Sequence, residues 1–230
     1  DLSACKPMPA EVPRVLCAAI AGGSLPTLTS VNVDGIALPV RELNGTVPVE
    51  LLDLSSQKLS VASGMVIAAL IGANNAVKSL RLANNPLRDE GLVPIARAIR
   101  GNPKAALTLL DVANTKFGVE GGKEIAWMVS KMGSLETLDM TGNRLCGVWV
   151  DQYGQQGKWS ADAVLALAEA IRESTSLATL LVGGNLIRDE GVKAIVGALR
   201  DDPEITCLGL ENNEIGVEGA KQLATAVGAM

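Results

Sequence analysis

Histidine is absent from this 230-residue sequence, and aromatic residues are scarce: there are three tryptophans, one tyrosine and one phenylalanine. The lack of histidine removes the commonest general base and the commonest metal ligand. The sequence also contains no G-x-x-x-x-G-K-[ST] phosphate loop, no G-x-S-x-G elbow and no EF-hand loop. We therefore predict no catalytic, cofactor-binding or metal-binding residues, and expect a protein that is not an enzyme.

An excess of basic residues is also missing. The chain has 20 lysines and arginines against 25 aspartates and glutamates, for a net charge of -5, so it lacks the basic surface that nucleic-acid binding requires. The four cysteines are too few and too widely spaced for a disulfide framework, which favours reduced thiols. The alternative is a disulfide between Cys5 and Cys17 that closes an N-terminal cap, which would indicate an oxidising compartment. The cysteines are Cys5, Cys17, Cys146 and Cys207.

Two uncharged runs, 15–33 and 59–77, approach the length of a membrane-spanning helix. The first contains Pro26 and two glycines, and the second contains serines and asparagines. We therefore predict no transmembrane segment, although docking on a membrane complex stays open. The sequence starts with Asp1, which suggests a removed leader or a fragment. We expect an intracellular protein, cytoplasmic or organellar, with a plastid as one option.

A leucine-rich phrase recurs through most of the sequence. The pattern L-x-x-L-x-L-x-x-N-x-L fits residues 77–87, 135–145, 177–187 and 205–215. The first position of each phrase falls at Leu28, Val49, Val77, Leu107, Leu135, Leu177 and Ile205. The prevailing spacing of about 28 residues leaves room for a short strand, a loop and an α-helix. Each unit is therefore predicted to be a strand followed by a helix.

Asparagine recurs at the ninth position of the phrase, where the strand must turn. A buried amide there can bond backbone groups of its own turn and of the adjacent turn, so we predict a structural asparagine ladder. Its members are Asn85, Asn143, Asn185 and Asn213. Ile36, Gln57 and Thr115 occupy the same position in other repeats, which predicts a weaker ladder in the early part of the chain.

These phrases and their period resemble the ribonuclease-inhibitor-like class of leucine-rich repeat proteins, which includes the repeat domains of NOD-like receptors and Ran GTPase-activating proteins. The opening of the repeats, residues 38–55, is also similar to leucine-rich repeat proteins of unicellular algae. The resemblance covers residues 28–230. It implies an α/β fold: a right-handed leucine-rich repeat solenoid, or horseshoe, of about seven repeats with a parallel sheet on the concave side and α-helices on the convex side. Residues 1–27 are predicted to form an N-terminal capping segment with a short helix over 10–21.

The concave face is the first candidate for partner binding. Alternate strand residues point to the same side, so the fifth position of each phrase should lie on this surface. That position holds Asn32, Asp53, Arg81, Asp111, Asp139, Leu181 and Gly209, and the seventh position begins with Asp34. The acidic part could attract a basic partner segment, or its short polar side chains could simply keep the sheet soluble.

An insertion between two repeats is the second candidate. Residues 146–159 account for the 42-residue spacing and contain two of the three tryptophans and the only tyrosine. Trp149, Tyr153 and Trp159 are residue types that dominate binding energy in interfaces, so an aromatic loop projecting from one rim is a candidate anchor. The alternative is that both tryptophans fold back onto the solenoid.

We therefore predict a non-enzymatic protein–protein interaction module, an accessory or scaffold subunit of a larger assembly whose partners are one or more proteins. The alternative is a regulator of an enzyme, either an inhibitor or a GTPase-activator-like protein. No polar capping unit follows the last helical pattern, which ends near Val227, so we expect a partner or further chain to cover that side.

Overall fold

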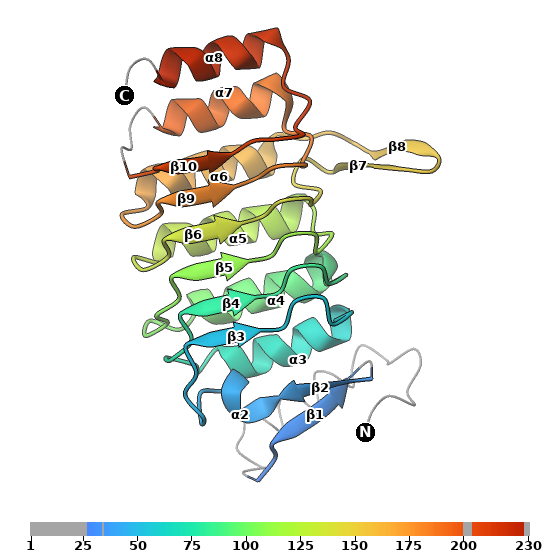
Figure 1. Ribbon diagram of the computed structural model, residues 1–230, viewed down its shortest axis with the longest axis vertical. Coiled ribbons are helices and arrows are strands. Elements are labelled where there is room, and N and C mark those ends of the chain that lie inside the picture. Colours follow the sequence, from blue (N-terminus) through green and yellow to red (C-terminus); the bar gives the residue numbers. More distant parts are fainter. Residues whose placement is uncertain (1–26, 34, 200–203, 228–230) are drawn as a thin grey trace.

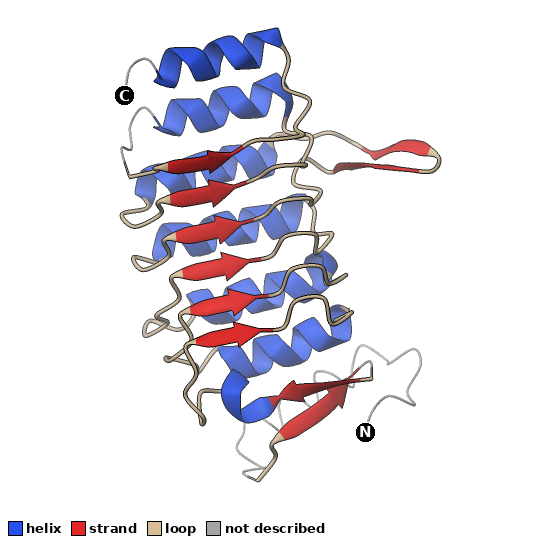
Figure 2. Ribbon diagram, viewed as in Figure 1, coloured by secondary structure: helices blue, strands red, loops and turns tan. Residues whose placement is uncertain are grey.

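The computed structural model describes residues 27–33, 35–199 and 204–227. Among them, six short parallel strands form one sheet, and the helices lie along one side of it (Figures 1 and 2). In spatial order the strands are β3 (Leu51–Asp53), β4 (Ser79–Arg81), β5 (Leu109–Asp111), β6 (Thr137–Asp139), β9 (Thr179–Leu181) and β10 (Cys207–Gly209). This arrangement confirms the predicted α/β solenoid, with a parallel sheet on one side and helices on the other.

A helix follows each strand of the sheet. The helices are α3 (Val61–Ile71), α4 (Arg88–Arg100), α5 (Val119–Lys131), α6 (Asp162–Glu173), α7 (Arg188–Leu199) and α8 (Val217–Val227). Apolar residues spaced three and four apart bury one stripe of each helix, as Ile195 and Leu199 do in α7. The middle residue of each strand points at that stripe, and Leu80, Leu138 and Leu180 are fully buried. The core is therefore a column of stacked aliphatic side chains.

The segment after Leu28 differs from the repeat predicted there. Strands β1 (Ser30–Val33) and β2 (Ile36–Pro39) pair antiparallel in a separate two-stranded sheet, and the short helix α2 (Val40–Leu43) follows. The 21-residue spacing is too short for a strand, a loop and a full helix. Asp34-Gly35 is moreover a dipeptide typical of two-residue hairpins, and Gly35 has a φ of +80°. The expectation that Asn32 lies on the parallel sheet was wrong, since it lies in β1.

Three other expectations concern residues outside the described ranges. The predicted capping helix over 10–21 and the thiols of Cys5 and Cys17 fall before residue 27. Asp34 is also outside the described ranges.

Buried asparagines connect successive turns. The Asn185 side-chain amide donates to the carbonyl oxygens of Met140, Val182 and Gly183, and its Oδ1 accepts from the backbone N–H of Leu145. Asn85, Asn143 and Asn213 make corresponding bonds within their own turn and to the preceding repeat. Thr115 takes the ninth position in its repeat, and its hydroxyl donates to the carbonyl of Val112. These bonds satisfy backbone groups that the turns would otherwise bury unpaired.

Aspartates in the first turn of a helix link one repeat to the next. Asp89 of α4 accepts hydrogen bonds at one carboxylate oxygen from the backbone N–H groups of Gly118 and Gly121, at 2.8 and 2.9 Å. These groups lie at the start of α5, where unpaired N–H groups attract negative charge. Asp189 bonds Gly216 ahead of α8 in the same way. The acidic residues therefore cap the following helix as well as standing in the first turn of their own.

Candidate partner-binding surfaces

The insertion forms a β-hairpin that projects from one rim of the solenoid (Figure 1). Strands β7 (Val148–Asp151) and β8 (Gly154–Gly157) pair antiparallel, with Asp151 opposite Gly154. Gly147 and Gly157 flank the base with positive φ angles of 73° and 82°, a conformation that glycine adopts without steric penalty. The sequence predicted a projecting loop at this rim, and the structure shows it as a regular hairpin.

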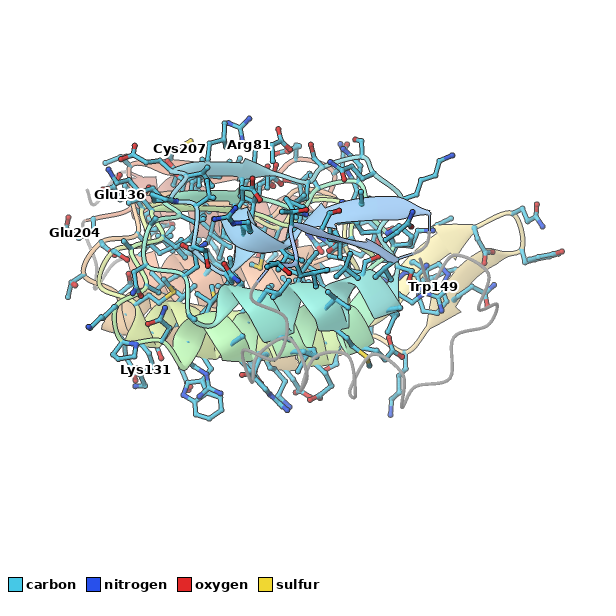
Figure 3. All side chains as sticks on the ribbon, turned by 90° about the horizontal axis from the view of Figure 1, so that it is seen from below. Arg81, Lys131, Glu136, Trp149, Glu204 and Cys207 are labelled. Atoms are coloured by element: carbon cyan, nitrogen blue, oxygen red, sulfur yellow. The ribbon has the colours of Figure 1, made fainter. Side chains whose placement is uncertain are left out.

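The hairpin tip is exposed and partly apolar. Tyr153 is 80% exposed and Val150 is 64% exposed. Trp149 lies nearer the base, where the Arg144 guanidinium stands 4.0 Å from the centre of its ring; Figure 3 shows Trp149 at this rim. Cation–π contact fixes the orientation of both groups. The tip therefore presents two side chains with little contact to the rest of the described chain.

Trp159 lies differently, against the solenoid. Its ring packs on the hydrophobic core, and its indole N–H donates to the carbonyl oxygen of Leu186 at 3.0 Å. Nearby, the Arg188 guanidinium donates to the side chain of Gln155 at 3.1 Å, which connects β8 to the start of α7. The sequence analysis left open the alternative that the tryptophans of the insertion fold back onto the solenoid. Trp159 does so.

The charged row on the sheet lies in register across four strands. Asp53 pairs with Arg81, Arg81 with Asp111, and Asp111 with Asp139. Adjacent strands are about 4.8 Å apart, and Arg81 makes a 3.9 Å ion pair with Asp53. Figure 3 shows Arg81 and Cys207 on the strand side and Lys131 on the helix side. The row therefore forms a continuous strip of mixed charge that is acidic at Asp111 and Asp139.

These aspartates also have a role within the fold. Asp53 accepts a hydrogen bond from the backbone N–H of Ser55, and Asp111 and Asp139 accept the equivalent bonds from Ala113 and Thr141, at 2.9 to 3.0 Å. A short acceptor at this position stabilises the turn that ends the strand. These turn hydrogen bonds explain why aspartate recurs at this position, and the explanation requires no binding partner.

Two residues of this row should respond oppositely to pH. Burial raises the pKa of Asp111 above its ordinary value of 3.8, and Asp139 adds to the rise, so its contribution to stability is lost as pH rises through the raised pKa. Hydrogen bonds from Ser55 lower the pKa of Asp53, so its contribution is present above 3.8 and lost as pH falls. From about pH 3 to pH 7, the unfolding free energy of Asp111→Asn should rise relative to the parent and that of Asp53→Asn should fall. Urea unfolding at several pH values would measure both, and slopes of the same sign would contradict the prediction.

The third tryptophan marks a helical surface that the sequence analysis missed. Trp127 of α5 is 51% exposed, and the Arg100 guanidinium lies 3.2 Å from its ring centre. Arg100 and Arg97 both bind the buried carboxylate of Glu124, at 3.0 and 2.9 Å. Hollows of about 260 and 320 Å³ lie beside this ring. The signal was available, because Trp127 falls outside the apolar stripe that includes Ile125.

The described residues offer little for redox or metal chemistry. Among them, no group of three or more acidic or cysteine side chains is placed to hold a metal ion. Cys146 and Cys207 are free, and burial raises the pKa of the Cys146 thiol to about 12. Within the same ranges, none of the helices has the length and apolar character needed to cross a membrane.

Comparison with known proteins gives partial matches along the chain. A family model described as "Leucine Rich repeat" matches residues 73–96 and 173–196. RAN GTPase-activating protein 2 of Arabidopsis thaliana is 28% identical over 123 residues, covering 53% of this chain and 22% of that protein. NACHT, LRR and PYD domains-containing protein 5 of Mus musculus is 25% identical over 228 residues, covering 95% of this chain and 18% of that protein. The chain thus spans about a fifth of the length of these relatives.

Two solved structures match part of the chain at low similarity. The leiomodin-1 actin-binding site 2 matches with a TM-score of 0.48 and 16% identity, covering 66% of this chain and 79% of that chain. The tropomodulin C-terminal domain of Caenorhabditis elegans matches with a TM-score of 0.47 and 11% identity, covering 66% of this chain and 83% of that chain.

Proposed function

The chain is a leucine-rich repeat protein whose relatives fit the ribonuclease-inhibitor-like class, and on that premise we propose that it is a non-enzymatic accessory or scaffold subunit of a larger protein assembly. Its partner docks on the β7–β8 hairpin, with the sheet row as a second contact. We further propose that the protein is intracellular, either cytoplasmic or organellar.

The projecting hairpin is the observation that supports the proposal. It interrupts an otherwise regular repeat, its base is held by Trp159 and by the bond from Arg188 to Gln155, and its tip exposes Tyr153 and Val150. A contact group on a fixed base loses less conformational entropy on binding than one on a free loop. Tyrosine combines a large apolar area with a polar tip and is enriched among residues that dominate interface energy.

Purification of a tagged chain from its source organism tests this proposal. The double variant Val150→Thr and Tyr153→Ser keeps a β-branched residue in the strand while removing the apolar tip. We expect co-purifying proteins at constant stoichiometry with the parent and a loss of about tenfold or more with the variant, because interface tyrosines often contribute more than about 1.4 kcal/mol.

Leu165 provides the matched control, because it is 51% exposed on α6 and belongs to neither strand of the hairpin. Leu165→Gln should retain the partners, and all three chains should have the same thermal unfolding midpoint. Full retention by the hairpin variant, or equal loss with Leu165→Gln, would remove the hairpin as the docking site.

The second candidate function is regulation of an enzyme. Two observations favour it: the acidic residues Asp111 and Asp139 lie in register on the sheet, and one relative is named as a Ran GTPase-activating protein. Recovery of the parent chain as a free monomer in the same purification would favour this alternative, whereas fixed stoichiometry favours the subunit.

A further inference from the structure

A hollow of about 380 Å³ lies at the base of the hairpin, between the starts of α4 and α5 and strand β7. Its size is in the range of pockets that hold small ligands or a few side chains. Three of its lining residues, Arg88, Lys116 and Arg144, are cationic, and Trp149 forms part of its wall. Lys116 and Arg144 occupy the tenth position of successive leucine phrases, so the solenoid stacks them on one rim.

The corresponding place in the last repeats contains an ion pair. Arg188 has the same phrase position as Arg88, and it binds Glu214 of the following repeat at 3.1 Å. At the position of Glu214, the repeat that follows Arg88 has Lys116. A cation therefore stands where the repeating architecture elsewhere supplies the neutralising carboxylate.

None of the three cations has an ion pair with a carboxylate of the described residues within 4.0 Å. Arg144 is also partly buried: loss of solvation and then the nearby charge of Arg88 lower the pKa of its guanidinium, while Asp151 and Asp89 act in the opposite direction. Asp151 is exposed on the hairpin, where water screens its charge. Exposed lysines without ion pairs are ordinary, but a partly desolvated arginine beside two further cations is unfavourable without an anion.

The acidic residues of the hollow only partly compensate this charge. The Asp89 carboxylate already accepts two backbone N–H groups at the start of α5, and that helix end offsets its negative charge. Glu90 is exposed, where water screens it. The position best suited to a bound anion is therefore beside Arg144, whose guanidinium is held against Trp149.

We propose that this hollow binds an acidic peptide segment of the partner, with carboxylates paired to Arg144, Lys116 and Arg88. The inference rests on the proposed function and names the chemistry of the docked segment. A planar guanidinium binds a carboxylate side-on through two N–H groups, and Trp149 provides an apolar wall for the adjoining methylene groups. Peptide carboxylates fit better than a phosphate dianion, because three spaced cations match several single charges and Asp89 and Glu90 repel a concentrated one.

Fluorescence anisotropy with a fluorescein-labelled peptide of six glutamates tests the inference, with a peptide of six glutamines as the uncharged probe. We expect the glutamate peptide alone to bind, with an affinity that falls as salt rises. Arg144→Gln and Lys116→Glu, the second at an exposed position, should each weaken binding about tenfold. Lys104→Glu is the matched control, because Lys104 is exposed in the turn between α4 and β5, at the opposite rim, and it should bind like the parent.

The inference is overturned if the glutamate peptide does not bind, if Lys116→Glu and Lys104→Glu weaken binding equally, or if inorganic phosphate at equal concentration displaces the peptide completely. The proposed function fails separately, if the Val150 and Tyr153 variant keeps its co-purifying proteins. Loss of those proteins without glutamate binding would leave the hairpin as the docking site and reject the acidic segment.

Discussion

Asn185→Ala is expected to lower the free energy of unfolding by about 3 kcal/mol. The Asn185 side chain is fully buried and bonds two successive repeats. Its alanine replacement leaves the backbone N–H of Leu145 with no acceptor among the described residues, since that group bonds only Oδ1 of Asn185. The carbonyl oxygens of Met140 and Val182 lose less, because each keeps a bond from another ladder asparagine.

The loss of stability in Asn185→Ala should be confined to one interface between repeats of the solenoid. Each repeat of such a fold contacts only its neighbours, so stability is a sum of repeat and interface contributions. Weakening the connection between β6 and β9 should let the two C-terminal repeats unfold at lower urea concentration than the rest. Circular dichroism should then show a broadened or two-step transition, with fast hydrogen exchange at Leu145.

Asn75→Ala is the matched control. Asn75 is exposed, and its side chain accepts one hydrogen bond from Asn102; both residues lie in helix-to-strand turns, at the rim opposite the strand-to-helix turn of Asn185. This substitution removes the same amide but should cost less than about 0.5 kcal/mol, because water replaces the lost bond. If Asn185→Ala costs no more than Asn75→Ala, the ladder does not stabilise the stack.

Much of this fold follows from the phrase itself. A leucine at its fourth position and an asparagine at its ninth are local signals with a local geometry, and Leu138 and Asn143 lie as such signals predict, buried in the column and in the turn. The register of Asp53 with Arg81 and Asp111 follows as well, because parallel strands of equal repeats place equal positions side by side. The periodicity of the sequence thus predicts where each repeated position lies in the fold.

What departs from the repeat was harder to predict. The hairpin of β1 and β2 replaces a repeat because the local Asp34-Gly35 turn signal competes with the leucine phrase, and a single leucine at position 28 did not reveal which would prevail. The cations of Arg88 and Lys116 each look ordinary in sequence. That they line the same hollow becomes apparent only when the residues after the strand are compared between repeats. At the equivalent positions of the last two repeats, Arg188 and Glu214 form an ion pair instead.

The two tryptophans of the insertion should separate folding from binding. Trp159→Ala is expected to lower the free energy of unfolding by about 2 to 3 kcal/mol, because it removes packing against the core and the bond to Leu186. Trp149→Ala should cost less than about 1 kcal/mol, since Trp149 contributes mainly the contact with Arg144.

Partner retention should show the opposite order once stability is matched. At a temperature where both variants are folded, Trp149→Ala should lose partner, because its ring lies on the exposed hairpin beside Arg144. Trp159→Phe keeps the apolar contact while removing the indole N–H, so it should restore most of the stability lost in Trp159→Ala and retain the partner. If Trp149→Ala binds normally and Trp159→Phe does not, docking depends on the indole at the root of the hairpin rather than on its projecting face.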